Sequence, residues 1–256
     1  MRGLTGLLLF LGVLGGVAAE ELRVGMDTRT PPWSFVPDVD YSREDLTRDP
    51  KPSEAQLRRL TGIDVDVVRA LCQRLQATPR IVPVAWFDEE KQLLAKRYDI
   101  IVGAWTPSPK TPTGIVATTS YYEWGLQIAV RAAEKKIRGY GDLGRSVVGH
   151  YRDAAAERTL LSLGARSLEP YDSQDAMFED LGSGKLDAVL FDSPYVRWRV
   201  TRDPAFRAVG EPLNRLGYHA GVRKEDTALL ERVQAVLKDL VASGTIAGIR
   251  RKWEGR

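Results

Sequence analysis

Hydrophobic and polar positions follow two alternating patterns along most of the chain. Short apolar runs rich in β-branched residues are typical of buried strands, and they alternate with stretches whose apolar residues recur at helical spacing. The runs predicted as strands are residues 22–26, 80–85, 98–102, 146–149 and 186–191. The stretches predicted as helices are residues 64–76, 89–96, 154–163 and 173–181. This alternation predicts an α/β fold, in which helices connect the strands of a sheet.

The second half of the chain repeats the plan of the first. Residues 96–103 and 185–190 each contain a basic residue, then an aspartate, then an apolar strand. Without residues 1–19, the chain of about 237 residues also exceeds the usual size of one domain. Two similar α/β lobes are therefore the simplest prediction.

The C-terminal region predicts two further helices. The first has one apolar stripe and is bounded by Asp226 as N-cap and by Gly244 at its end. Its stripe consists of Leu229, Val233, Val236 and Leu240, and the second helix carries Ile246, Ile249 and Trp253. We expect both helices to pack on one lobe.

Residues 37–60 interrupt the alternation. They contain many charged residues and three prolines, Pro37, Pro50 and Pro52, with little apolar periodicity. The segment is interpreted as an exposed insertion, and a lid or a docking surface is the alternative, since long loops in compact domains are often functional.

The first nineteen residues have the pattern of a removable signal peptide. A basic start is followed by an apolar stretch over residues 4–17, and Val17-Ala18-Ala19 offers small residues at a cleavage site. A membrane anchor is the alternative, but the stretch is shorter than the roughly 20 residues that span a bilayer and is interrupted by Gly12, Gly15 and Gly16. Since no cysteine lies near the cleavage site, we expect export to the periplasm without a lipid anchor or membrane insertion.

Charge and cysteine content narrow the classes of partner. Once the signal segment with Arg2 is removed, 36 basic residues face 34 acidic ones, and the basic residues are dispersed. Nucleic acid is therefore not favoured as a partner, because phosphate binding needs concentrated positive charge. The single cysteine, Cys72, has no internal disulfide partner and lies in an apolar helical stripe, which predicts a buried structural thiol.

A series of short motifs resembles the bacterial family 3 extracellular solute-binding proteins, the polar amino-acid binders of ABC importers. The motifs lie in the family's order and span nearly the whole mature chain. They are Leu22-Arg-Val-Gly-Met-Asp27, Pro31-Pro-Trp-Ser-Phe35, Gly62-Ile-Asp-Val-Asp66, Val82-Pro-Val-Ala-Trp86, Tyr98-Asp-Ile-Ile-Val-Gly103, Tyr121-Tyr122, Asp142-Leu143-Gly144, Val147-Val-Gly149, Gly184 to Asp192 and Gly244 to Trp253.

The resemblance implies a two-lobed periplasmic-binding-protein-like fold (type II), with a small-molecule ligand held between the lobes. Matching the motifs places one lobe at residues 20–124 plus 218–256 and the other at 125–217, with crossing strands near 123–126 and 216–220. It further implies a monomer that delivers its ligand to an ABC transporter permease and needs no cofactor. The carboxyl ends of the strands are also where ligands bind in open α/β sheets.

The resemblance also proposes ligand-binding residues. Trp86 matches an aromatic that stacks on the ligand, with an ordinary core tryptophan as the alternative. Asp192 matches an acceptor of a ligand amino group, with a helix N-cap as the alternative. Trp33 lies in the family's proline-aromatic turn, and Trp105 and Thr106 lie in the loop that follows the third predicted strand.

Several positions depart from the family pattern. Thr111 stands where the family has an arginine that binds the ligand carboxylate, with Lys110 beside it. In the other lobe, Arg152 precedes Asp153-Ala-Ala155 where a hydroxyl-bearing turn is usual, and Thr30 replaces an aromatic. We therefore expect the ligand not to be a standard α-amino acid held in the usual way; a modified amino acid, an organic acid or another small polar metabolite remains open.

Two other classes of function compete with a binding protein. Some relatives of this fold are similar to periplasmic cyclohexadienyl dehydratases, and His150 and His219 are candidate cleft histidines. A histidine pair without a nucleophile or metal-ligand spacing is weak evidence for catalysis. The other alternative is an accessory protein with a degenerate cleft that docks through the charged insertion.

Protein recovered from the periplasm should begin at Glu20, because Val17 and Ala19 suit the cleavage pocket of a signal peptidase. N-terminal sequencing of exported material checks this. Exported material that begins with Met1 would contradict it.

Overall fold

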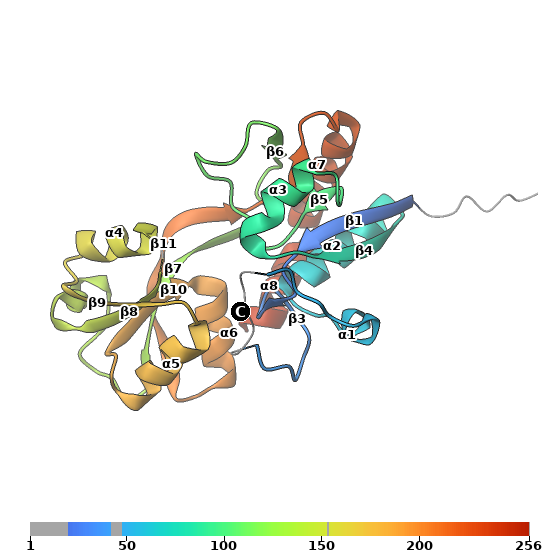
Figure 1. Ribbon diagram of the computed structural model, residues 1–256. Helices are drawn as coiled ribbons and strands as arrows, with labels where there is room; N and C mark the ends of the chain where they lie inside the picture. The colour runs from blue at the N-terminus through green and yellow to red at the C-terminus, as the bar shows by residue number, and fades with distance from the viewer. Residues whose placement is uncertain (1–19, 42–47, 153, 256) are drawn as a thin grey trace, which may run out of the picture.

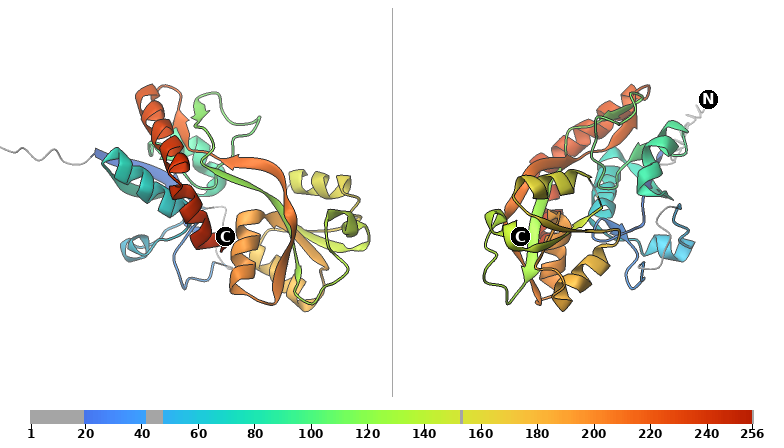
Figure 2. Two further views of the ribbon diagram at one scale, coloured as in Figure 1. Left: turned by 180° about the vertical axis from the view of Figure 1, so that it is seen from behind. Right: turned by 60° about the vertical axis from the view of Figure 1, so that its left-hand side comes forward.

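Two five-stranded mixed sheets organise the chain in the computed structural model, which describes residues 20–41, 48–152 and 154–255 (Figure 1). The predicted signal segment therefore lies outside the described residues. Helices pack against each sheet, so the two-lobed α/β fold is confirmed (Figure 2).

The first sheet has the order β4-β1-β5-β12-β6. Its strands are β4 (Ala77–Pro83), β1 (Glu20–Met26), β5 (Ile100–Ile101), β12 (Gly221–Arg223) and β6 (Ile115–Ala117). β4, β1 and β5 are parallel, whereas β12 is antiparallel to both of its neighbours. The helices of this lobe are α2 (Ile63–Leu75), α3 (Glu89–Leu94), α7 (Thr227–Ala242) and α8 (Thr245–Glu254). Because the apolar stripe of α2 faces the core, Cys72 is buried there as predicted.

The second sheet has the order β11-β7-β10-β8-β9. Its strands are β11 (Phe206–Tyr218), β7 (Tyr122–Arg131), β10 (Ala188–Asp192), β8 (Val147–Tyr151) and β9 (Ser167–Tyr171). β10, β8 and β9 are parallel, and β7 is antiparallel to β10 and to β11. The helices of this lobe are α4 (Ala154–Ser162), α5 (Gln174–Ser183) and α6 (Ser193–Arg202).

Small elements complete the two lobes, and all of them except η2 belong to the first lobe. They are the hairpin β2 (Arg29–Thr30) and β3 (Ser34–Phe35), the short helix α1 (Glu54–Arg58), and the 3₁₀ turns η1 (Trp86–Asp88) and η2 (Tyr140–Arg145). The insertion at 37–60 is therefore not entirely a loop, because Ser53 and Gln56 form a capping box that starts α1. Residues 42–47 of the insertion lie outside the described residues.

Two long strands connect the lobes. β7 leaves the first lobe and β11 returns to it, and Tyr122 pairs with Tyr218 at the first-lobe end of the ladder. The ladder has two register irregularities, between Val209 and Leu213 and between Leu213 and Leu216. β7 covers the crossing predicted near 123–126, and β11 covers residues 216–218 of the crossing predicted near 216–220.

Most predicted elements are present, with shifted ends. The strand predicted at 98–102 has only two paired residues, Ile100 and Ile101. β9 was not predicted, since Ser167-Leu-Glu-Pro-Tyr171 lacks the apolar run of a buried strand, and it forms the outer edge of the second sheet. In α7, Leu237 rather than Val236 is fully buried.

Gly25 in β1 should tolerate no side chain. A Cβ atom on Gly25 would lie 2.2 Å from Cζ of Tyr98, whose ring is fully buried and whose hydroxyl donates to the carbonyl of Glu89 at 2.5 Å. Gly25→Ala should lower the free energy of unfolding by about 2 to 3 kcal/mol, measured by urea denaturation. The control is Gly139→Ala, which has open space and extended backbone and should change it by less than about 0.5 kcal/mol. Equal stability of both variants would contradict this packing.

Candidate functional site

The carboxyl ends of parallel strands gather the predicted ligand residues at one edge of each sheet. In the first lobe, Asp27 follows β1 and the loop with Trp105 follows β5. In the second lobe, Arg152 follows β8 and Asp192 ends β10. Since β1 and β5 are parallel, and β8 and β10 are parallel, each pair of segments emerges at the same edge of its sheet.

A buried ion pair forms the centre of the first-lobe edge. Arg29 donates to Asp27 through Nε at 3.0 Å and through Nη2 at 2.8 Å, and both side chains are buried. Nη2 also donates to the carbonyl of Arg48 at 2.9 Å. This bidentate arrangement fixes Arg29 on its own loop, so its charge is largely compensated before any ligand arrives.

Two more carboxyl groups are buried beside this pair. Glu89 begins α3 and is 2 % exposed, and Asp64 lies in the first turn of α2 and accepts from the Tyr121 hydroxyl at 2.9 Å. Burial raises the pKa of Glu89 well above its ordinary value, and the nearby charges of Asp27 and Asp64 raise it further. Burial also raises the pKa of Asp64 to about 7, against the hydrogen bond from Tyr121. Burial and the neighbouring negative charges therefore both favour the protonated form of Glu89.

The loop after β5 is tied to α3 by Glu90. Its Oε1 accepts from Trp105 Nε1 at 3.1 Å and from Thr111 Oγ1 at 2.9 Å. Trp105 is buried, so its indole serves as packing as well as a donor. Thr106 donates to the carbonyl of Gly217 at 3.0 Å, and Lys110 is exposed. The position at which the family has an arginine thus carries Thr111, whose hydroxyl group is hydrogen-bonded to the Glu90 carboxylate.

Trp86 is not a core residue. It is 53 % exposed, and the neighbouring Phe87, 52 % exposed, meets it edge-on with ring centroids 6.1 Å apart. Both belong to η1, directly before Glu89 and Glu90. The sequence interpretation named Trp86 but missed Phe87 and both glutamates, although Trp86-Phe-Asp-Glu-Glu90 marks them as one run.

Trp33 and Thr30 have structural contacts. Trp33 is 5 % exposed, donates through Nε1 to the Tyr218 hydroxyl at 3.1 Å and stacks on Tyr195 at 6.3 Å. Thr30 donates to the carbonyl of Asp27 at 3.4 Å. Trp33 thus bridges the first lobe, a crossing strand and α6 of the second lobe.

The second-lobe edge carries Asp192 and Arg152. Asp192 is partly buried and occupies the N-cap position of α6, as the alternative interpretation predicted, although its side chain makes no cap hydrogen bond. Arg152 is exposed and donates through Nε to Asp172 at 2.8 Å. Asp153, which follows it, lies outside the described residues.

Each of the two histidines has a ring nitrogen close to a backbone carbonyl group. Nδ1 of His150 lies 2.8 Å from the carbonyl of Tyr151, and Nδ1 of His219 lies 2.7 Å from the carbonyl of Thr118. Within residues 20–41, 48–152 and 154–255, no group of histidine, cysteine and acidic residues is arranged to hold a metal ion. In the same ranges, no helix has the length and apolar character needed to cross a bilayer.

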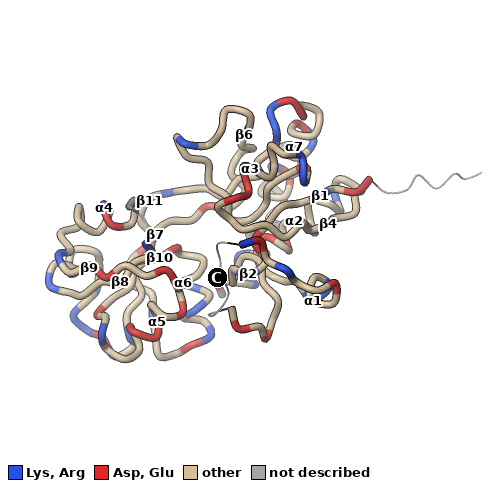
Figure 3. The backbone as a smooth tube through the Cα atoms, viewed as in Figure 1, with Lys and Arg blue, Asp and Glu red and all other residues tan. Residues whose placement is uncertain are grey.

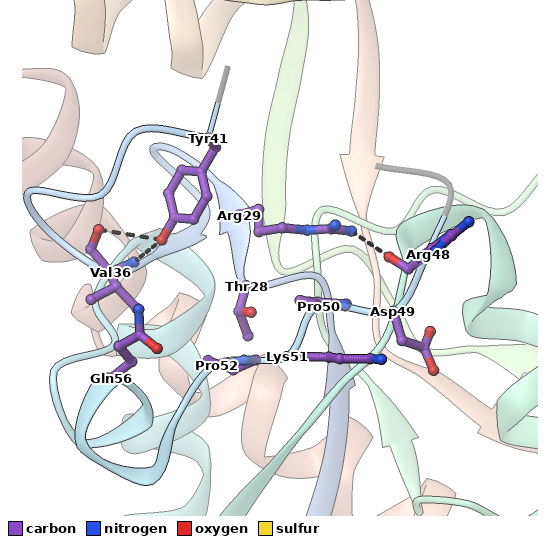
Figure 4. A pocket seen from close by; sticks show the side chains of 10 residues that line it. All are labelled: Thr28, Arg29, Val36, Tyr41, Arg48, Asp49, Pro50, Lys51, Pro52 and Gln56. Atoms are coloured by element: carbon purple, nitrogen blue, oxygen red, sulfur yellow. Dashed lines mark hydrogen bonds between the residues drawn. The ribbon is translucent and has the colours of Figure 1, made fainter. Parts of the chain in front are cut away.

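A cavity of about 380 Å³ lies beside the charged insertion (Figure 4). Thr28 and Arg29 from the first-lobe edge line it together with Asp49, Lys51 and other residues of the insertion, and its lining lies entirely in the first lobe. It therefore adjoins the predicted site but is not a space enclosed between two lobes.

Two α/β lobes, each with polar residues at the carboxyl ends of its parallel strands, joined by two crossing strands, are typical of two-lobed ligand-binding proteins. The model of the bacterial extracellular solute-binding proteins, family 3, matches residues 47–256, and the chain belongs to this family.

Characterised relatives and a solved structure agree with this assignment. The chain is 23% identical to the ABC transporter arginine-binding protein 1 of Escherichia coli strain K12, covering 93% of each chain. It is 26% identical to the L-cystine-binding protein TcyJ of the same strain, covering 91% of this chain and 82% of the relative. An ancestral amino acid-binding protein described as a precursor of cyclohexadienyl dehydratase has the same fold, with a TM-score of 0.69, 23% identity and coverage of 91% and 95%.

Replacing Glu89 by glutamine should make stability less dependent on pH. The pKa of Glu89 is higher in the folded protein than in the unfolded chain, where it is about 4.5. Its contribution to the free energy of unfolding is therefore complete below about pH 4.5 and is lost as the pH rises toward the folded-state pKa. Glutamine stays neutral, so the unfolding free energy of Glu89→Gln relative to the unaltered protein should grow with pH, by at most about 1.4 kcal/mol per pH unit.

Urea denaturation in steps from about pH 5 to about pH 9 measures this difference. Glu21→Gln, at an exposed strand end, is the control and should run parallel to the unaltered protein. A Glu89→Gln curve that is also parallel would show that the buried carboxyl group is ionised throughout.

Proposed function

We propose that this protein captures a small polar or organic-acid-like solute between its two lobes and presents it to the permease of an ABC importer. Family membership over residues 47–256 carries this proposal. The arrangement of two strand-end edges joined by two crossing strands supports it, because a ligand that contacts both lobes favours the closed form by its differential affinity.

The proposal assigns residues 20–124 and 218–256 to one lobe and 125–217 to the other. It places a monomeric protein in the periplasm, after removal of residues 1–19. The positions of β7 and β11 support these boundaries, since Tyr122 and Tyr218 mark the end of the shared ladder next to the first sheet.

Ligand contacts are proposed for both edges. Trp86, with Phe87 beside it, offers an exposed aromatic surface from the first lobe, and Asp192 offers a carboxylate from the second. Lys110 and Arg152 are exposed cations near the respective strand ends. Trp105 and Thr106 hold the first-lobe loop in place through hydrogen bonds to Glu90 and Gly217. Trp33 and Thr30 support the same edge through hydrogen bonds to Tyr218 and Asp27.

The ligand is proposed to differ from a standard α-amino acid bound through an arginine. Two relatives are named for binding arginine and L-cystine. In this chain, however, Thr111 is engaged by Glu90, and the nearest buried guanidinium, Arg29, is engaged by Asp27. A free ligand carboxylate would therefore meet little uncompensated positive charge at the first-lobe edge, apart from Lys110.

A dehydratase has less support than a binding protein. The relatives described above are binding proteins, and both histidines are held by backbone carbonyl groups. Incubating the protein with prephenate, a cyclohexadienyl acid, and following its loss separates the two functions.

Protein isolated from its native host should contain its ligand, and mass spectrometry of the small molecules it releases will identify that compound. Calorimetry with this compound and with the twenty standard amino acids then tests the assignment. Asp192→Ala should weaken binding by about 2 to 5 kcal/mol, since it removes a charged hydrogen-bond partner at a partly buried site.

The control is Asp203→Ala at the opposite end of α6, which should bind like the unaltered protein. Unchanged binding by a folded Asp192→Ala would remove Asp192 from the site. Micromolar binding of a standard amino acid that depends on Asp192 would overturn the proposed ligand class, and the absence of any bound or binding solute would overturn the capture function.

A further inference from the structure

Helix α8 contacts both lobes. It packs on α2 of the first lobe and on α6 of the second, and its C-terminal end lies beside α6 (Figure 2). A Cβ atom on Gly255, just after α8, would lie 2.9 Å from the Thr201 side chain of α6. The end of the described chain is therefore part of the contact between the lobes.

A buried ion pair lies at this contact. Arg197 of α6 donates through Nη1 to Glu254 Oε2 of α8 at 2.9 Å, and the two residues are 8 % and 3 % exposed. Removing two charges from water costs free energy that their attraction repays only with good geometry and further hydrogen bonds. A pair buried between two lobes is therefore better explained by the orientation it imposes than by the stability it adds.

Both members of the pair are also bonded to one crossing strand. Arg197 donates through Nε to Gln127 at 3.1 Å, and Glu254 accepts from the Tyr122 hydroxyl. Gln127 in turn donates to the carbonyl of Gly210 at 2.7 Å, on the other crossing strand. Because these partners lie on β7 and β11, the ion pair lies next to the strands about which the lobes would rotate.

Aromatic rings also meet at this contact region. Phe35 of the first lobe meets Trp198 of α6 at 6.2 Å and Trp253 of α8 at 5.9 Å, both edge-on. Arg202 lies over Trp198 with a distance of 5.0 Å to the ring centroid. Ring contacts accept small sliding movements, whereas a hydrogen-bonded ion pair fixes direction and distance.

We propose that the Arg197–Glu254 pair is the fixed pivot for movement of the lobes, and that Arg197 and Glu254 are positioning residues for Asp192. The pair holds α6 against the first lobe, and α6 begins directly after Asp192. The positioning role rests on the proposed capture function; the pivot itself is a property of the ligand-free protein.

The test uses full-length mature protein without ligand. Glu254→Gln keeps an acceptor for Tyr122 but removes the buried negative charge that pairs with Arg197 at 2.9 Å. Small-angle scattering well below the unfolding temperature should then give a larger radius of gyration and a broader distance distribution than the unaltered protein. Amide exchange in α6 and α8 should quicken on the order of a hundredfold, while α5 is unchanged.

The matched control is Glu211→Gln. Glu211 is the second acidic neighbour of Arg197, at 3.9 Å, but its side chain is 86 % exposed. Its replacement should leave scattering and exchange unchanged, because an exposed pair at this distance contributes little.

The double variant Arg197→Met with Glu254→Leu separates positioning from stability. It removes both charges, so it should regain stability relative to Glu254→Gln and yet keep the altered scattering. It also provides the measurement if Glu254→Gln alone does not fold. Scattering identical to that of the unaltered protein in the folded variants would overturn the pivot. If scattering supports the pivot but the protein binds no solute, only the proposed function is overturned.

Discussion

The pairing of β7 with β11 is the constraint on which the relation between the lobes depends. The two crossing strands are also the edge ladder of the second sheet, so the same hydrogen bonds build that lobe and connect it to the first. Their approach is close: a Cβ atom on Gly125 would lie 2.2 Å from the carbonyl oxygen of Leu213. Asn214 has φ 56° within the second register irregularity, between Leu213 and Leu216, and such bulges increase bending and twist. The ladder is therefore continuous at its ends and deformable in its middle.

Polar groups buried next to these strands make the arrangement specific rather than merely compact. In the first lobe, Asp27 is compensated by Arg29, and burial raises the pKa of Glu89 well above its ordinary value. Both effects limit the net charge of the strand-end edge while leaving it polar. A raised pKa favours the protonated carboxyl group, which can both donate and accept hydrogen bonds.

The fold was largely predictable because its main signals are local. Apolar residues at helical spacing predicted α2 and α7, and the apolar runs predicted β1 and β10. β9 was missed because it is a five-residue edge strand that contains Glu169 and Pro170. Its sequence therefore lacks the run of apolar residues by which a buried strand is predicted. Its pairing with β8 is a tertiary property.

The candidate site was less predictable because residue type does not determine contacts. Trp33 and Trp105 are both tryptophans in family motifs, yet both are buried and hydrogen-bonded, whereas Trp86 is exposed. The engagement of Thr111 by Glu90 joins residues 21 positions apart. The periodicity of apolar residues predicts helices and strands but not a contact of this kind. The sequence therefore predicted which segments form the candidate site, but not the contacts of each side chain.

Helix α6 shows how contacts far from the strand-end edge affect Asp192, the proposed ligand residue of the second lobe. Arg197 is fixed between two lobes, and Asp192 lies five residues earlier, which is about 7.5 Å along a helix axis. A rotation of α6 by roughly 10° about Arg197 would therefore displace Asp192 by about 1 Å, enough to change a hydrogen bond. Since the ion pair sets this angle, the precision of a carboxylate at the second-lobe edge depends on a glutamate at the end of the first lobe's last helix.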